Sequence, residues 1–392
     1  MPDAVATQNQ KDVLKTLIAI LIKIAPFIGL IFVWLLFWSQ LGSRFANVPT
    51  QTEILLQSTI IGIAALGATI IIIAGGIDLS VGSTIAMVSM VLAKILHSTS
   101  MSPTLAVVLG LLAAAACGLA IGAMVVGHVG RVVAVVVGLL AGMIWLPQQG
   151  LGLALSIPIG VVIAVGLWFL AGLTIRDLKL APFIVTLGMM GIIRGLAKMV
   201  GVYGNEQAST QITPSRTTWI DKLNAFQNEG PFSFILSYFP ISVLLFAGLA
   251  IAMALMLRFT KFGRHIYAIG SNEETARLCG VNIARTKILI YTLGIALAGV
   301  AGVLLFAKIG QGNATEAVGY ELAVIAAVVI GGASLSGGEG SILGTVIGAL
   351  IMQIVIVGCI KMDMDNYVQE IITGAIIVAA VALDQLRHRR PT

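Results

Sequence analysis

Charged residues are scarce in this sequence. Of its 392 residues, 10% are charged and 58% are apolar, whereas a soluble domain carries roughly 25% charged residues. So few charges cannot cover a water-facing surface, which excludes an ordinary soluble protein of two or three domains. Most of the surface must face lipid, and we expect one helical bundle in a membrane.

Features that would point to catalysis are also missing. The three cysteines are odd in number and scattered, which argues against a disulfide framework or a metal site. Neither H-E-x-x-H nor G-x-S-x-G occurs, so a hydrolase embedded in the membrane is not expected. The phosphate-binding motif G-x-x-x-x-G-K-[ST] is absent as well, and we expect no ATP or other cofactor in this chain.

Long apolar runs fill nearly the whole chain. A helix needs about 20 apolar residues to cross the hydrocarbon core. The runs lie at about 18–38, 54–75, 80–96, 105–126, 132–147, 152–173, 182–200, 234–257, 288–307, 319–334, 339–359 and 367–386. They predict an all-α polytopic membrane protein of about 12 transmembrane helices, in which the fifth and tenth runs are short enough to be re-entrant instead.

Lysine and arginine set the expected orientation. They gather in the first 23 residues, in the loop 258–287 and in the tail after 386. An even number of spans places these regions on one side, and basic loops stay in the cytoplasm. We therefore expect both termini to be cytoplasmic, and the net charge of +6 needs no nucleic-acid partner. No small-residue cleavage site follows the first run, which predicts a retained first span rather than a signal peptide.

Glycines four residues apart recur within the runs. They are Gly340, Gly344 and Gly348, Gly138 with Gly142, Gly118 with Gly122, and Gly191 with Gly195. Since four residues make about one helical turn, each set forms a flat strip that lets another helix approach closely. We expect helix contacts at these strips rather than ligand sites.

Three segments stand out from the apolar background. In the first, Gly76 precedes Asp78, Ser80 and Gly82, which predicts a helix break and a new helix capped by Asp78 or Ser80. In the second, Pro182 fits the first turn of a helix.

The third segment lies within the basic loop 258–287. The stretch from Asn272 to Gly280 carries a capping Asn, two acids in the first turn, a late Arg and a final Gly, which is the pattern of a short capped helix. Such a helix is either a solvated connector or a docking element for a cytoplasmic partner.

Four stretches together resemble the permease subunits of ribose- and xylose-type ABC importers. They are GIDLSVGS at 76–83, LAPFIVTLGMMGIIRGLA at 180–197, FGRHIYAIGSNEETARLCGVNIARTK at 262–287, and AAVVIGGASLSGGEGSILGTVIGALI at 326–351. The second stretch contains Pro182 and Phe183. The stretches occur in the order typical of that family and reach from near the second span to the last.

The resemblance implies a transport subunit, not an enzyme, in the bacterial cytoplasmic (inner) membrane, surrounded by lipid. Such permeases work in pairs, so a second copy of the chain is the expected partner. A periplasmic sugar-binding protein delivers the substrate, and a cytoplasmic subunit binds ATP and Mg and hydrolyses the ATP. The positions that match the ATPase-coupling motif are Asn272, Glu273, Glu274, Ala276, Arg277 and Gly280.

The chain departs from this family between about 127 and 168. Relatives of this kind usually have about ten spans and pass almost directly from the run at 105–126 to the PFIVTL sequence. We interpret 127–168 as a two-helix insertion at the periphery of a single permease domain, 1–392. Two extra spans keep both termini on the same side.

A path for sugar needs polar side chains that hold hydroxyl groups weakly. The candidates are Thr186, Gln311, Asn313, Tyr320, Glu321 and Gln353. Each has a competing explanation as a loop residue or as a hydrogen-bonding group between helices. A monosaccharide, with a pentose such as ribose or xylose favoured, is the expected solute.

Other functions stay open. An ABC permease of this kind is alternatively specific for an autoinducer-like sugar derivative, a nucleoside or a branched-chain amino acid. An ion-coupled secondary sugar carrier would bury acids or bases, and Asp78, Arg194, Glu321 and Glu370 are the candidates. No convincing inverted repeat supports such a carrier. A membrane anchor without transport activity is disfavoured because a large soluble domain is missing.

Overall fold

A computed structural model describes residues 24–140, 153–174, 178, 180–202, 211–212, 219–225 and 239–388. Parts of the first, fifth, sixth and eighth predicted spans lie outside these residues, as does Gly142. Helices dominate the described part of the chain. The single sheet there consists of two-residue strands, β1 (Gln211–Ile212) and β2 (Gly312–Asn313), paired antiparallel with Gln211 opposite Asn313.

The helices follow the predicted apolar runs in order. They are residues 24–41, α2 (Val48–Ile73), α3 (Val81–Ser98), α4 (Pro103–Val126), α5 (Val129–Leu140), α7 (Leu153–Thr174), α8 (Pro182–Val202), α10 (Ile241–Phe259), α13 (Ile283–Ile309), α14 (Tyr320–Ile330), α15 (Ile342–Lys361) and α16 (Asn366–His388). Two further helices, α11 (Lys261–Ser271) and α12 (Glu273–Leu278), stand in the basic loop. Short 3-10 turns lie at Gly42–Arg44 and Trp219–Asn224.

Seven of the described helices are long and apolar enough to cross a membrane. This confirms an all-α, multi-pass membrane protein; the twelve crossings and the cytoplasmic termini stay predictions. Helix α14 has 11 residues and is about 16 Å long, roughly half the thickness of a hydrocarbon core. The helix in the tenth run is therefore too short to span as a straight helix, and whether this run crosses the membrane or is re-entrant stays a prediction.

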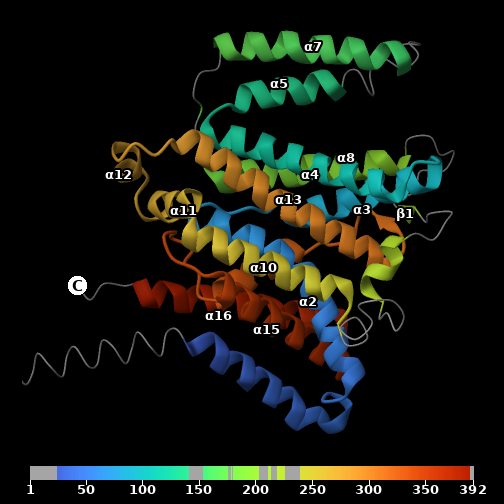
Figure 1. The fold of residues 1–392 in the computed structure, drawn as a ribbon, viewed down its shortest axis with the longest axis vertical. Coiled ribbons are helices and arrows are strands. Elements are labelled where there is room, and N and C mark those ends of the chain that lie inside the picture. Colours follow the sequence, from blue (N-terminus) through green and yellow to red (C-terminus); the bar gives the residue numbers. More distant parts are fainter. Residues whose placement is uncertain are drawn as a thin grey trace, which may run out of the picture.

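Helix α2 forms the centre of the bundle. Its residues from Ser58 to Ile73 are all buried. Helix α13 packs against α4, α2 and α3, while α15 and α14 cover another side of α2. In Figure 1, α5 and α7 form a separate pair at one edge, beside α4. The insertion at 127–168 itself stays a prediction, and residues 141–152 of it lie outside the described residues.

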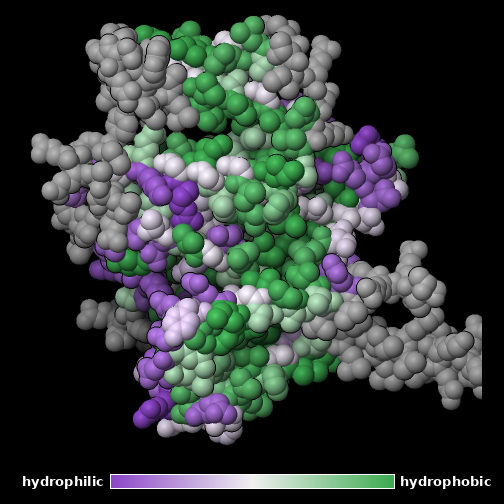
Figure 2. Space-filling view, turned by 180° about the vertical axis from the view of Figure 1, so that it is seen from behind, coloured by the Kyte–Doolittle hydropathy of each residue, from purple (hydrophilic) through white to green (hydrophobic). Residues whose placement is uncertain are grey.

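Polar and apolar surfaces separate along the bundle. Helix α12 and the C-terminal end of α16 lie on one side of the molecule, and β1 lies on the opposite side (Figure 1). Hydrophobic side chains cover the face between these sides in Figure 2, where hydrophilic ones gather toward the two edges. Exposed apolar residues on this scale suit contact with lipid rather than water.

Several glycine strips make the predicted helix contacts. A Cβ added at Gly344 or Gly348 would lie 1.9 Å from a backbone oxygen of Gly331 or Ala327, so α15 and α14 touch through their backbones. A Cβ at Gly138 would lie 2.3 Å from the Cα of Ala164, which closes α5 against α7. Gly118 and Gly122 meet the backbone of α13 in the same way.

Two glycine sets differ from the expected pattern in the described residues. Added Cβ atoms at Gly191 and Gly195 meet nothing within 4 Å among the described residues, so this face of α8 contacts no other described helix. Gly340 does not belong to the α15 strip, because α15 begins at Ile342 and Gly340 adopts a φ of +155° in the preceding loop. Spacing along a sequence identifies a flat strip but not its partner or the helix boundary.

Candidate functional site

The predicted break after α2 is present. The helix ends at Ile73, and Gly75 takes a φ of +79°, a conformation that favours glycine. The N–H groups of Gly75 and Gly76 donate to the carbonyls of Ile72 and Ile71, each at 2.9 Å. These bonds satisfy the last carbonyls of α2 before the chain continues to α3.

Asp78 organises the turn into α3. Its Oδ1 accepts hydrogen bonds from the backbone N–H and the hydroxyl of Ser80, both at 2.7 Å. Ser80 is the N-cap of α3, but its side chain makes no capping hydrogen bond. The predicted side-chain cap of α3 by Asp78 or Ser80 is therefore wrong, because Asp78 bonds Ser80 in the turn before the helix and, in the described chain, accepts from no N–H of α3 itself. Asp78 is 3% exposed, and its Oδ2 has no hydrogen-bond partner in the described structure.

Gly76 and Tyr291 fit against each other. A Cβ at Gly76 would lie 2.3 Å from the hydroxyl oxygen of Tyr291, so a larger residue would displace that hydroxyl. Tyr291, on α13, is 3% exposed, and its hydroxyl has no hydrogen-bond partner within the described residues. Leaving such a buried group unpaired costs about 1–3 kcal/mol.

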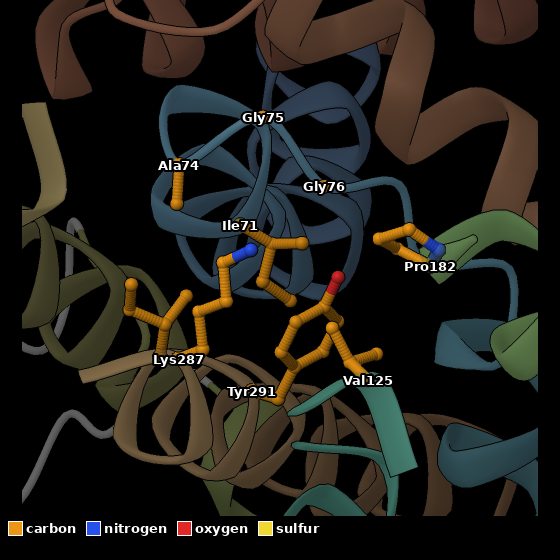
Figure 3. A pocket seen from close by; sticks show the side chains of 9 residues that line it. Ile71, Ala74, Gly75, Gly76, Val125, Pro182, Lys287 and Tyr291 are labelled. Atoms are coloured by element: carbon orange, nitrogen blue, oxygen red, sulfur yellow. The ribbon is translucent and has the colours of Figure 1, made fainter. Parts of the chain in front are cut away.

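A small pocket lies beside this contact. Its lining consists of Ile71, Ala74, Gly75, Gly76, Val125, Pro182, Lys287, Ile290 and Tyr291. Figure 3 shows the Lys287 ammonium and the Tyr291 hydroxyl pointing from α13 toward the end of α2. Neither residue was selected from the sequence. The only sequence signal was a tyrosine and a lysine at a spacing of four residues at the start of an apolar run.

A second polar group holds the segment between α13 and α14. Arg194 on α8 donates through Nη1 to the backbone oxygens of Ala314, at 3.0 Å, and Glu316, at 2.7 Å. The side-chain amide of Asn313 donates to Glu316 Oε2 at 3.3 Å, and its oxygen accepts from the N–H and hydroxyl of Thr315. Arg194 and Asn313 are thereby engaged in shaping this loop.

Glu321 lies where the first turns of α14 and α3 meet. Its Oε1 accepts from the N–H of Gly319 at 3.2 Å. A Cβ at Gly82 would lie 2.3 Å from Oε2, which has no hydrogen-bond partner among the described residues. Since helix N-termini carry partial positive charge, an acidic group between two of them is favoured.

The remaining path candidates are spread through the fold. Thr186 is fully buried and its hydroxyl faces the backbone oxygens of Ile77 and Phe183, each at 3.2 Å. Gln311 and Tyr320 are half-buried at either end of the segment held by Arg194. Gln353 is buried on α15, and its Oε1 has no partner in the described part of the chain.

The second predicted segment begins α8. Pro182 is its first residue, as expected, and Phe183 is 47% exposed. The six candidates are therefore spread over several elements: Thr186 lies beside the break, four residues lie in or just before the first turn of α14, and Gln353 lies on α15.

Helix α12 has the predicted construction. The Asn272 side chain accepts from the N–H of Thr275 at 2.8 Å, and Glu273 and Glu274 occupy the first turn. Arg277 lies 3.1 Å from Glu274, and Gly280 ends the turn with a φ of +83°. The capped helix inferred from the sequence is confirmed; its docking role stays a prediction.

The two faces of α12 differ in exposure. Ala276 is 4% exposed and faces the protein, whereas Leu278 is 87% exposed. Glu273 joins α12 to the first turns of α13 through an ion pair with Lys287, whose Nζ lies 2.5 Å from Oε2. Leu278 is thus an exposed apolar side chain on a helix that is fixed to α13.

Helix α11 anchors α12 to the break after α2. A Cβ at Gly270 would lie 1.7 Å from the backbone oxygen of Ile73, the last residue of α2, and the N–H of Gly338 donates to the same oxygen at 2.8 Å. Tyr267 donates its hydroxyl to the Gly340 carbonyl at 2.8 Å, and burial raises the pKa of Tyr267. Three segments thus meet at the end of α2.

Comparison with known proteins gives consistent matches. The family model described as the permease component of a branched-chain amino acid transport system matches residues 51–146 and 126–381. The ribose import permease of Escherichia coli K12 is 32% identical over 374 residues, covering 95% of this chain and 94% of that protein. The fructose import permease of Rhizobium meliloti is 31% identical over 360 residues, covering 92% and 84%.

A third relative extends the range of named sugars. The galactose/methyl galactoside import permease of Haemophilus influenzae is 30% identical over 352 residues, covering 88% of this chain and 89% of that protein. No solved structure matches. These matches identify a transport component rather than an enzyme, placed in the bacterial cytoplasmic membrane. The chain belongs to the permease family of ABC importers that includes the ribose, fructose and galactose permeases.

Proposed function

We propose that this chain forms the membrane path of an ATP-driven importer that moves a monosaccharide inward, with a pentose such as ribose or xylose favoured. The observation that carries the proposal is the capped helix α12, which exposes Leu278 and is tied to the break after α2. The relatives support the solute class, because ribose permeases from Escherichia coli and Bacillus subtilis are each 32% identical to this chain.

The proposed partners divide the work between them. A cytoplasmic ATPase binds ATP and Mg and docks on α12, a periplasmic binding protein delivers the sugar, and a second copy of the chain completes the path. The coupling group consists of Asn272, Glu273, Glu274, Ala276, Arg277 and Gly280. ATP hydrolysis shifts the population between two packings of the helices, which requires the ATPase to bind one packing more tightly than the other.

The contacts of α11 support a mechanical role for this loop. Close backbone contact at Gly270 leaves little room for α11 to move without the end of α2. A displacement of α12 would therefore reach the Gly75–Gly76 break directly. This break is followed by α3, whose first turn meets Glu321 of α14. The polar groups that we propose along the path are Thr186, Gln311, Asn313, Tyr320, Glu321 and Gln353.

The domain organisation is also a proposal. We treat 1–392 as one permease domain, with 258–287 as the coupling loop and 127–168 as an added helical pair. The edge position of α5 and α7 supports this arrangement, since an added pair there leaves the centre of the bundle undisturbed.

A second function has one specific observation in its favour. Asp78 Oδ2 and Glu321 Oε2 are buried carboxylate oxygens without hydrogen-bond partners in the described residues. Acids of this kind serve as proton relays in ion-coupled carriers. The relatives are ABC permeases, so we rank this function below import driven by ATP.

Reconstitution distinguishes the two functions. The chain is placed in proteoliposomes with candidate ATPase and binding-protein partners, and uptake of ribose, xylose, fructose and galactose is measured. An ABC importer shows uptake that requires internal ATP and the loaded binding protein. Uptake that follows an imposed proton or sodium gradient without ATP would refute the proposal.

A further inference from the structure

The unpaired Tyr291 hydroxyl is the starting observation. Tyr291 is 97% covered by protein, yet its polar atom faces the pocket instead of a hydrogen-bonding group of the described chain. Figure 3 shows this hydroxyl between the glycine break of α2 and Val125 of α4. A buried hydroxyl with no partner in a pocket is available to bond a ligand that carries its own polar groups.

The other walls of the pocket indicate the class of ligand. Ile71, Val125, Pro182 and Ile290 offer apolar surface, and Lys287 adds one cationic group that is already paired with Glu273. A monosaccharide presents both hydroxyl groups and apolar C–H faces. An anion would gain little from Lys287, because the charge of this lysine is already paired with Glu273. A purely apolar solute would leave the Tyr291 hydroxyl unpaired, at a cost of about 1–3 kcal/mol.

Lys287 and Tyr291 share one face of α13, because four residues separate them. The Lys287–Glu273 ion pair therefore connects the pocket wall to α12 through a single turn of helix. Gly75 and Gly76 form another wall of the pocket, and they belong to the break after α2, which α11 contacts. The pocket is narrow in this conformation, with space for about one water molecule. Helix α8 or α13 must move before a sugar can enter.

We propose that this pocket is an inner subsite of the solute path, where the Tyr291 hydroxyl hydrogen-bonds a hydroxyl of the passing monosaccharide. The subsite opens when α12 moves, and it is closed in the conformation described here. Because Gly76 has no side chain, it leaves room for the Tyr291 hydroxyl. This inference rests on the proposed import of a monosaccharide, and it adds a contacting residue that is separate from the six candidates chosen by sequence.

The test uses the complete importer in proteoliposomes and the monosaccharide that the unaltered protein transports, together with its singly deoxygenated analogues. Initial uptake is measured at saturating loaded binding protein. Tyr291→Phe is expected to slow the parent sugar about tenfold, the effect of losing about 1.4 kcal/mol from one hydrogen bond. The analogue that lacks the contacted hydroxyl is expected to be slowed less than twofold.

The control is Tyr367→Phe, which removes a solvent-exposed hydroxyl bonded to Asp365 and is expected to leave every rate unchanged. Equal slowing of the parent sugar and all analogues by Tyr291→Phe would show a structural role and overturn the subsite. Unchanged uptake would overturn it as well. If the unaltered importer moves no sugar with ATP, the proposed function itself has failed, before any variant is compared.

Discussion

The ammonium nitrogen of Lys287 on α13 lies 2.5 Å from carboxylate oxygen Oε2 of Glu273 on α12. The lysine side chain is 18% exposed and the glutamate side chain 37%, so the pair is only partly solvated. This is the direct electrostatic link between the proposed ATPase-docking helix and the wall of the inner pocket. Solvent screens this pair in part, and the contribution expected of it is that of a partly exposed ion pair.

Reversing the charges of this pair separately is expected to uncouple the importer. In Glu273→Lys or Lys287→Glu, like charges face each other and push α12 away from α13. We expect sugar transported per ATP hydrolysed to fall about threefold to fivefold, the effect of about 1 kcal/mol. The double reversal restores an attractive pair and is expected to recover most of the loss. The ratio of uptake to phosphate release in proteoliposomes measures both.

A matched control is the ion pair between Lys361 and Glu53, at 3.2 Å. It joins the end of α15 to the start of α2, away from the end of α2 that α11 contacts. The same reversals there are expected to leave the ratio unchanged. A double reversal of Glu273 and Lys287 that transports no better than either single change would contradict the link.

Leu278 is expected to anchor the ATPase. Its 87% exposed side chain offers apolar area on a helix whose other exposed residues are polar or charged. Burying a leucine in a partner's cleft contributes about 2 kcal/mol, so Leu278→Asp should weaken binding of the ATPase about 30-fold or more. Affinity is measured between the purified permease and ATPase in detergent.

Leu278→Met supplies the control, because it keeps apolar volume and is expected to bind within about threefold of the unaltered chain. Binding that is insensitive to both changes would remove α12 from the docking surface. Since Leu278 contacts little of its own chain, the thermal stability of the permease alone should be the same in all three proteins.

The effect of Gly270→Ala on stability tests the close contact between α11 and the end of α2. It lies inside helix α11, where Gly→Ala normally stabilises by about 1 kcal/mol. Its added Cβ would lie 1.7 Å from the Ile73 oxygen, which must shift. We therefore expect Gly270→Ala to lower the melting temperature in detergent by several degrees. Gly248→Ala in α10, where a Cβ meets nothing within 4 Å among the described residues, should raise it slightly or leave it unchanged.

Local signals predicted local structure well in this chain. The break at Gly76, the start of α8 at Pro182 and the capped helix from Asn272 each depend on residues within one or two turns, where dihedral preferences and capping decide the outcome. The apolar runs predicted the helices for a similar reason, because lipid requires every backbone group to be paired within its own segment.

Contacts between distant segments were not predictable in this way. Tyr291 looked like an ordinary residue of an apolar span, and only the packing of α13 against α2 places it over Gly76. Gly191 and Gly195 show the converse case. Their spacing suits a helix contact, but the described residues place no other helix against them. Which helix faces pack together depends on the whole bundle, so this pairing could not be predicted from one sequence alone.

A substitution at Glu321 distinguishes import driven by ATP from transport by an ion-coupled carrier. Its carboxylate lies between the first turns of α14 and α3, and Oε1 already accepts from Gly319. Glu321→Gln keeps an acceptor of the same size but can neither release nor accept a proton as a relay. For an importer driven by ATP, we expect uptake to stay within about threefold of the unaltered protein, with a small loss because the favourable charge at the helix ends is removed.

Glu321→Ala should lower the stability of the protein by about 1 kcal/mol or more, since it also leaves the Gly319 N–H unpaired. Abolished uptake in Glu321→Gln, in protein that folds and binds the ATPase normally, would contradict transport without a relay and favour an ion-coupled step.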